Sequence, residues 1–359
     1  MLDSAVNVEQ FLNKCKNQQQ LGLDTEFLRV KTYYPQLCLI QISNGQESVC
    51  IDPLTESVKQ VLANFLREYQ GTWLMHACKQ DLEVLAISLG VLPANIFDTQ
   101  IAAALLGIGA QSSYAALVSK ICDVELEKSQ TRTNWCQRPL TSAQLEYAEA
   151  DVQYLSDLYE EFSNCLADKG RQDWMLEECN SFGTLDDFIG PQPPLLIKAG
   201  ADLGPDAQNR LWNLMKWRES RAQKLDLPRE WVINSHDLVN IARANPTDKT
   251  SLRDIVDLQI RSFEKLHEPL LNVLSNELEN APNNFWPVRR GLDDMEKKRL
   301  KSLQKMLLQI ASEEEVEPTL VANRKNLENL ILGLPGSLDS GWRKELAGDA
   351  LKQQLSNGI

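Results

Sequence analysis

Six residues near the middle of the chain, Ile189-Gly190-Pro191-Gln192-Pro193-Pro194, separate two stretches of different hydrophobic pattern. A helix cannot run through this segment, because proline lacks an amide hydrogen and clashes with the preceding turn. The chain has 359 residues, more than one hydrophobic core usually organises at roughly 100 to 200 residues per domain. We therefore predict a first domain over residues 1–190, a linker over residues 191–203 and further domains beyond it.

The first domain alternates segments of strand and helix pattern. Period-two apolar runs and the Asn-Gly turn signal predict strands, whereas 3.6-residue periodicity predicts helices. The predicted strands are 20–27, 36–43, 48–51 and 72–77; the predicted helices are 58–69, 80–89, a helical stretch over 99–122, and a long helix that opens with a capping box at Thr141-Ser142-Ala143-Gln144. This alternation is typical of an α/β layer fold.

The second half of the chain has a wholly helical pattern and an internal repeat. Residues 210–246 align with residues 299–335 without gaps, and ten of the 37 aligned pairs are identical. The identical pairs include much of the apolar spacing that would build a helical core. We interpret the two segments as a duplicated module of about 80 residues, over 204–284 and 285–359; chance alignment of amphipathic helices is the alternative.

Composition and charge narrow the class of protein. Hydrophobic residues make up 43% and charged residues 24%, which is typical of a folded soluble chain. Asp3 and Glu9 stand where a signal peptide needs a basic patch, so we expect a cytoplasmic protein. Eight cysteines show no metal-type spacing, so we expect reduced thiols.

The acidic excess lies in the first half of the chain. Residues 1–190 hold 13 basic and 26 acidic side chains, a net charge of −13, and residues 191–359 hold 24 of each. An acidic surface repels polyanions at long range, which argues against a simple nucleic-acid coat protein. It is compatible with a metal site built from carboxylates, although a generic solubilising surface explains the charge equally well.

Four acids and one tyrosine form the candidate catalytic set. Asp24 and Glu26 leave the same face of a predicted strand, because side chains alternate along a strand. Asp81 falls on the first turn of a predicted helix, and Tyr147 and Asp151 stand one turn apart on another. Taken alone, each has a structural alternative: an exposed strand edge for the first pair, a helix-start acid for Asp81, and an ordinary helix surface for the last pair. Together, the carboxylates offer hard oxygen ligands suited to Mg²⁺ or Mn²⁺.

Three segments resemble the exonuclease motifs of the DEDD superfamily, in its tyrosine-containing branch. They are LGLDTEFLRVKTYYPQLCLIQI, HACKQDLEVL and LEYAEADVQYL. Their order, the segments KSQTRTNW and SGWRKEL, and the following helical repeat are similar to the ribonuclease D family. The second module departs further from the HRDC pattern than the first.

The resemblance implies a ribonuclease H-like mixed sheet flanked by helices, followed by two all-helical HRDC-type domains. It implies that Asp24, Glu26, Asp81 and Asp151 hold two divalent metal ions (Mg²⁺ or Mn²⁺), and that Tyr147 positions the attacking water. A phenol with a pKa near 10 is a poor base at neutral pH, so we expect Tyr147 to act through a hydrogen bond. Hydrolysis would release nucleoside 5′-monophosphates from RNA 3′ ends.

Substrate contacts are predicted in two loops. Lys128, Arg132 and Trp135 offer charge and stacking for a terminal nucleotide, although a lid held by surface pairs is the alternative. Tyr33, Tyr34 and Gln36 are candidates for the nucleotide pocket, with strand packing of the aromatic residues as the alternative. A basic stretch begins the second module and is interpreted either as a surface that tracks the RNA backbone or as a solvated helix face: Arg289, Arg290, Lys297, Lys298, Arg299, Lys301 and Lys305.

The functional expectation is a metal-dependent 3′–5′ exoribonuclease. The resemblance implies transfer RNA precursors with 3′ extensions as substrates, with no membrane and no obligate protein partner. A DNA 3′–5′ exonuclease is one alternative, since the acids do not distinguish ribose from deoxyribose. A catalytically silent RNA-binding scaffold is the other.

Overall fold

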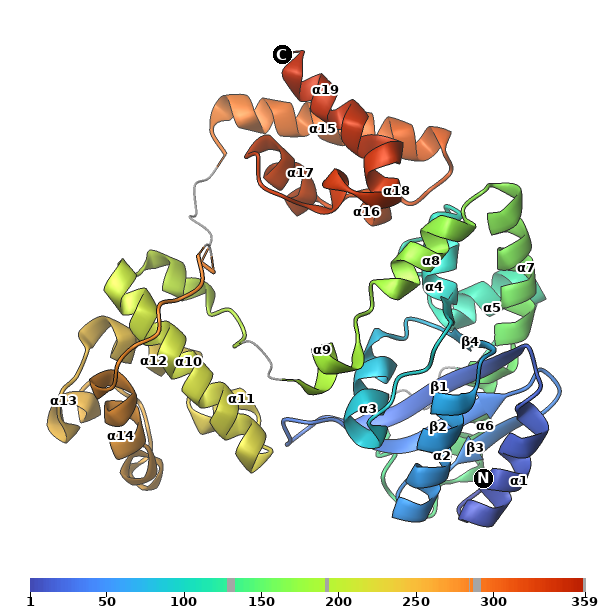
Figure 1. Cartoon of the computed structure of the whole chain (residues 1–359), viewed down its shortest axis with the longest axis horizontal. Helices are drawn as coiled ribbons and strands as arrows, with labels where there is room; N and C mark the ends of the chain where they lie inside the picture. Colours follow the sequence, from blue (N-terminus) through green and yellow to red (C-terminus); the bar gives the residue numbers. More distant parts are fainter. Residues whose placement is uncertain (128–132, 191–193, 284, 287–291, 358–359) are drawn as a thin grey trace. The chain divides into compact units, whose positions relative to one another are not determined.

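The computed structural model describes residues 1–359 apart from 128–132, 191–193, 284, 287–291 and 358–359 (Figure 1). By compactness the chain forms two units. The first comprises Met1–Leu28, Gln36–Ile189 and Leu292–Ile359, and the second comprises Arg29–Pro35 and Gly190–Gly291. The four-segment domain division made from the sequence stays a prediction. Within the described ranges, no helix combines the length and apolar character needed to cross a membrane.

A five-stranded sheet forms the centre of the first unit, in the order β3-β2-β1-β4-β5 (Figure 1). The strands are β1 (Gln20–Leu28), β2 (Gln36–Ser43), β3 (Ser48–Ile51), β4 (Thr72–Met75) and β5 (Ile96–Asp98). β1, β2 and β3 pair antiparallel, whereas β1 with β4 and β4 with β5 pair parallel. The predicted mixed sheet is confirmed. β5 was not predicted, because three residues are too few to show a strand period.

Nine described helices accompany this sheet up to residue 189. They are α1 (Ala5–Cys15), α2 (Glu56–Glu68), α3 (Lys79–Leu89), α4 (Thr99–Leu105), α5 (Tyr114–Cys122), α6 (Ser142–Gln153), α7 (Leu155–Asp168), α8 (Gln172–Asn180) and α9 (Leu185–Ile189). The capping box at Thr141 and Gln144 is confirmed. The long helix predicted after it is broken at Tyr154, whose N–H donates to the Tyr114 hydroxyl at 2.9 Å. A tertiary contact therefore sets this break.

The two faces of the sheet meet different layers. Leu21 and Leu23 belong to the core that includes α1, α2 and α3, whereas α6 packs on β1, β2 and β3. Figure 1 draws α2 in front of the sheet and α6 behind it. Asp24 and Glu26 alternate with Leu21 and Leu23, so they face α6. The strand period thus places two carboxylates between the sheet and the helix that carries Asp151.

The second helical module shares a hydrophobic core with the exonuclease half of the first unit. It contains α15 (Asp294–Glu313), α16 (Pro318–Val321), α17 (Arg324–Ile331), a 3₁₀ turn (Ser337–Asp339), α18 (Gly341–Arg343), a π turn (Lys344–Gly348) and α19 (Asp349–Ser356). Leu303 and Trp342 lie in one buried cluster with Leu158 and Phe162 of α7. This module is therefore part of the first unit.

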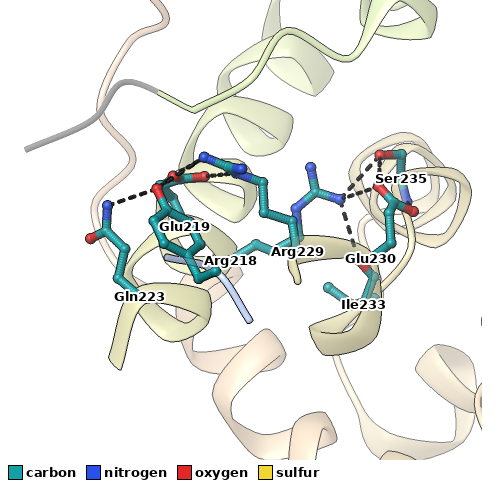
Figure 2. Close-up of polar contacts among 8 residues, drawn as sticks. Arg218, Glu219, Gln223, Arg229, Glu230, Ile233 and Ser235 are labelled. Atoms are coloured by element: carbon teal, nitrogen blue, oxygen red, sulfur yellow. Dashed lines mark hydrogen bonds and ion pairs between the residues drawn. The ribbon is translucent and has the colours of Figure 1, made fainter. Parts of the chain in front are cut away.

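The first helical module has a core of its own in the second unit. It contains a 3₁₀ turn (Lys198–Asp202), α10 (Pro205–Leu225), α11 (Arg229–Val232), α12 (Ser235–Ala244), α13 (Lys249–Arg253) and α14 (Ile260–Ser275). Two ion pairs join α10 to α11 (Figure 2). Arg229 donates to both carboxylate oxygens of Glu219 at 2.6 Å. Arg218 is buried and donates, within 3.2 Å, to oxygens of Glu230, Ser235 and Ile233.

Candidate active site

Three carboxylates from β1 and α6 gather at one point. Asp24, Glu26 and Asp151 each offer an oxygen, and these oxygens lie within 4.8 Å of one another. Asp24 and Glu26 reach the site because they are two apart on a strand. Asp151 reaches it because α6 packs across β1. The spacing in the sequence identified the shared face of the strand, and the packing of α6 supplied the third acid.

Asp81, the fourth acid, lies next to this group on α3. It is 8% exposed and accepts a 2.5 Å hydrogen bond from the Thr25 hydroxyl. Thr25 stands between Asp24 and Glu26 and points to the other side of β1. The charge of Asp81 contributes to raising the pKa of Asp24. Asp81 is therefore coupled electrostatically to the three gathered carboxylates, although it is not one of them.

Asp98 holds the turn that leads into α3, and sequence reasoning missed it. Its carboxylate accepts from the N–H groups of Ala77 and Cys78 at 3.1 and 2.9 Å, and it also caps α4. Ala77 has a φ of 53°, a left-handed conformation that non-glycine residues rarely adopt. The buried Asp98 stabilises that strained turn and so helps to position Asp81. Its place directly before a helix was the only sequence signal.

Burial raises the pKa values of all four acids, and repulsion between them adds to the rise at Asp24 and Glu26. Desolvation is the largest cause for each of them, followed for Asp24 and Glu26 by the charges of the neighbouring carboxylates. The pKa of Asp24 is raised well above its usual value, and those of Glu26, Asp151 and Asp81 rise to about 8, about 7 and about 6. Positive charge among them would remove the repulsion. The donor set, carboxylate oxygens without sulfur or imidazole, fits a hard divalent cation.

Tyr147 and Trp135 line the carboxylates from the α6 side. A hydrogen bond from Tyr147 lowers the pKa of Asp151, and one from Trp135 lowers that of Glu26. The two rings lie 6.1 Å apart between centroids. Trp135 is only 3% exposed, so in this structure it supports Glu26 from inside the protein. Its predicted role in stacking on a nucleotide stays a prediction.

The other candidate substrate residues lie in different surroundings. Lys128 and Arg132 fall outside the described residues. Gln36 is exposed at the start of β2. Tyr34 is half-buried, and its N–H donates to Asp226 at 3.0 Å. Gln36 belongs to the first unit and Tyr34 to the second, and the contact of each with a nucleotide stays a prediction.

The neighbouring Tyr33 is anchored within the second unit. Its hydroxyl donates to Glu219 and accepts from Arg229 at 2.9 Å and from Gln223 at 3.1 Å. The Arg229 guanidinium lies 4.5 Å from the centroid of the Tyr33 ring. Asp226 also accepts from the N–H of Tyr33 at 3.0 Å. Residues 29–35, which connect β1 to β2, thus pack with the first helical module.

Two cysteines near the site form a disulfide. Cys38 on β2 is bonded to Cys136, whose Cα lies 4.8 Å away and 98 residues later in the sequence. The prediction that every thiol is reduced is wrong for this pair. The spacing carried no such signal, because the contact depends on how the segment before α6 packs on β2. The six other cysteines are free.

The described part of the basic stretch of the second module lies on α15. Lys297, Lys298, Lys301 and Lys305 are exposed, and Lys297 pairs with Asp294 at 3.0 Å. Arg289 and Arg290 fall outside the described residues. RNA binding by this surface stays a prediction.

Comparison with known proteins agrees with the fold. Residues 1–167 match the family model described as 3′-5′ exonuclease, and residues 207–274 match the HRDC domain model. Ribonuclease D of Xanthomonas oryzae pv. oryzae is 35% identical, covering 90% of each chain. Ribonuclease D of Pseudomonas paraeruginosa is 34% identical, covering 95% of this chain and 93% of the relative.

A solved structure agrees along the same length. The crystal structure of Escherichia coli RNase D, an exoribonuclease involved in structured RNA processing, is similar to this chain. It is 28% identical with a TM-score of 0.86, and the match covers 99% of this chain and 98% of that one. The HRDC match covers the first helical module, so the assignment of the second to the HRDC type stays a prediction. The chain belongs to the ribonuclease D family and is a 3′–5′ exoribonuclease.

Proposed function

We propose that this exoribonuclease is metal-dependent, with Asp24, Glu26, Asp81 and Asp151 as the residues that hold its divalent cations. The observation that carries the proposal is the group of three half-buried carboxylates, Asp24, Glu26 and Asp151, whose oxygens lie within 4.8 Å of one another. Without a cation, the loss of hydration and the repulsion between the carboxylates destabilise their charged forms. The raised pKa values of these acids indicate this cost.

The bound cations would lower the pKa of a water molecule and stabilise the charge that develops on the phosphodiester oxygens. Burial and neighbouring carboxylates raise the pKa of Tyr147 above its usual value, so its phenol stays protonated at neutral pH. Tyr147 therefore donates a hydrogen bond and orients the nucleophile. Trp135 holds Glu26, and Thr25 holds Asp81.

We also propose that the substrates are transfer RNA precursors with 3′ extensions, and that both helical modules are of the HRDC type and bind the body of the RNA. The structured-RNA role stated for the Escherichia coli protein supports this substrate class. A DNA substrate has no comparable support. Matched RNA and DNA oligonucleotides would separate the two, because only RNA carries the 2′-hydroxyl.

The test is stepwise shortening of a 3′-extended transfer RNA with Mg²⁺ or Mn²⁺, with EDTA, and with the Asp151→Asn protein. We expect mononucleotide release to require the metal and Asp151. Asp157→Asn is the matched control, because Asp157 is an exposed acid in the first turn of α7 and should leave turnover unchanged. Wild-type turnover by Asp151→Asn, or full activity in EDTA, would refute the assignment.

A further inference from the structure

A glutamine at the centre of the sheet has no partner for its side chain. Gln41 on β2 is 0% exposed, and neither its amide nitrogen nor its amide oxygen forms a hydrogen bond in the described structure. Buried amides are nearly always paired, because an unpaired amide loses its hydration without compensation. An apolar side chain of the same size would fill this position at a lower free energy. The glutamine therefore calls for a functional explanation.

The strand register places Gln41 beside the carboxylates. Gln41 lies directly opposite Asp24 in the antiparallel pair of β1 and β2, and opposite Cys50 in the pair of β2 and β3. Directly opposed residues project from the same face, with Cβ atoms about 5 Å apart. The next pair on that face joins Glu26 to Leu39. Gln41 thus stands in the row that α6 covers, next to Asp24 of the carboxylate group.

The residues opposite and next to Gln41 indicate which group its amide can bind. Cys50 already donates its thiol hydrogen to the Leu145 carbonyl at 3.8 Å and has a pKa raised to about 12, so it stays a neutral thiol. The charges of Asp81, Asp151 and Glu26 act on Asp24, and a hydrogen bond from the Thr25 backbone lowers the pKa of Asp24. A carboxylate that binds a cation through one oxygen is usually oriented by a donor at its other oxygen. The amide N–H of Gln41 is the unused donor in this row.

We propose that Gln41 is a positioning residue of the cation site, whose amide N–H orients the Asp24 carboxylate when divalent cations are bound. This inference rests on the proposed cation site. Gln41 touches neither the substrate nor the reacting atoms; it acts through Asp24. The proposal gives the unpaired Gln41 amide a partner, the Asp24 carboxylate.

The test compares Gln41→Met with the wild-type protein in two measurements. Methionine keeps the length of the side chain and removes its hydrogen-bonding atoms. We expect the unfolding temperature in EDTA to stay equal or rise, because an unpaired amide is removed, while Mn²⁺ affinity measured by isothermal titration or by Mn²⁺ paramagnetic resonance falls about tenfold, as is typical when a partner of a metal ligand is lost. Gln41→Leu is the second variant if Gln41→Met folds poorly.

Trp73→Phe is the matched control. The Trp73 indole nitrogen on β4 is also buried without a partner, but its ring belongs to the core on the other side of the sheet, with α1 and α2. This variant removes an unpaired donor and should leave Mn²⁺ affinity unchanged.

The possible outcomes distinguish a failure of the role proposed for Gln41 from a failure of the proposed cation site. Wild-type Mn²⁺ affinity in folded Gln41→Met, or a lower unfolding temperature in EDTA, would overturn the role of Gln41, while Mn²⁺ binding by the wild type would leave the cation site standing. If the wild type binds no Mn²⁺, or if Asp24→Asn binds it equally well, the cation site itself fails.

Discussion

The two helical modules begin from the same pattern and end in different surroundings. Positions matched in the repeat play equivalent parts: Leu214 and Leu303 are both fully buried, and Asn234 and Asn323 cap α12 and α17 with their side chains. Yet the first module closes its own core, whereas the second packs into the core of the exonuclease half. Equivalent internal positions therefore fix how each module folds, and outward-facing residues fix what it packs against.

The outward contacts of the second module are specific to it. Arg171, which directly precedes α8, donates to the Leu105 carbonyl at 2.6 Å and to the Glu315 carbonyl at 3.2 Å. Trp342 stacks on Trp174 of α8, with ring centroids 4.7 Å apart. The second module thus contributes to the stability of the half that holds the carboxylates. The first module instead holds the loop 29–35.

The largest expected effect comes from matched cavities in the two cores. Leu303→Ala and Leu214→Ala should each cost about 2–5 kcal/mol of unfolding free energy, as for other buried leucines. Leu303→Ala should lower the unfolding transition of the first unit together with exonuclease activity at raised temperature. Leu214→Ala should lower only the transition of the second unit. Calorimetry with hydrogen exchange checks this, and equal loss of exonuclease stability in both variants would break the comparison.

The pH dependence of stability should also differ between the units. Folding raises the pKa values of Asp81, Asp151 and Glu26 to about 6, about 7 and about 8, so the folded first unit binds more protons than the unfolded chain above the ordinary carboxyl range. Its stability in EDTA should therefore fall by a few kcal/mol as pH rises from about 4 to about 8.

Unfolding temperatures measured across this pH range test the sign. Mn²⁺ should reverse the fall, and Asp24→Asn should make it shallower. In the second unit, the pKa values of Glu230, Asp248 and Glu264 are instead lowered. A first unit that gains stability between pH 5 and pH 8 in EDTA would contradict the expectation.

A smaller effect is expected at the buried ion pair of the second module. The Glu178 carboxylate of α8 accepts a hydrogen bond from Arg343 Nη2 at 2.8 Å. It also accepts one from the Trp342 indole nitrogen at 2.8 Å. Arg343→Ala would leave the buried carboxylate short of its charged partner and should cost about 2 kcal/mol in the first unit. Lys249→Ala, which breaks an exposed pair in the first module, should cause no measurable change. Chemical denaturation gives both values, and equal effects would show that burial does not matter here.

The smallest effect concerns the loop held by the first module. Asp226→Ala removes the acceptor for the N–H groups of Tyr33 and Tyr34, worth about 1 kcal/mol. Hydrogen exchange of these two amides should accelerate several-fold, while exchange in the core of α10 stays as it was. Unchanged exchange at both amides would mean that Asp226 does not hold the loop.

Local sequence patterns predicted most strands and helices, whereas contacts between distant segments decided where some helices end. The strands at 20–27, 36–43 and 48–51 were predicted from period and turn chemistry within one or two residues. The stretch 99–122 instead contains two helices, and the long helix after Thr141 stops at Tyr154. Its N–H is captured by Tyr114, 40 residues away. Such a contact leaves no trace in the local pattern.

The candidate site divides in the same way. Alternation along β1 was enough to put Asp24 and Glu26 on one face, and the strand-to-helix order was enough to bring Asp81 near them. The pairing of Cys38 with Cys136, the burial of Trp135 and the support from Asp98 became visible only after folding. These depend on side chains that meet from distant segments.

The amino-acid sequence alone predicted the α/β half, a helical second half and the candidate acids, because strand and helix periods, turn residues and helix caps act over a few neighbouring residues. Three-dimensional packing established that the second helical module joins the exonuclease core, that residues 29–35 belong with the first module, and that Gln41 lies unpaired beside Asp24. The physical reason is that burial and electrostatics depend on which surfaces meet. Many helices and strands have the same spacing of apolar residues, so the spacing does not determine which surface packs on which.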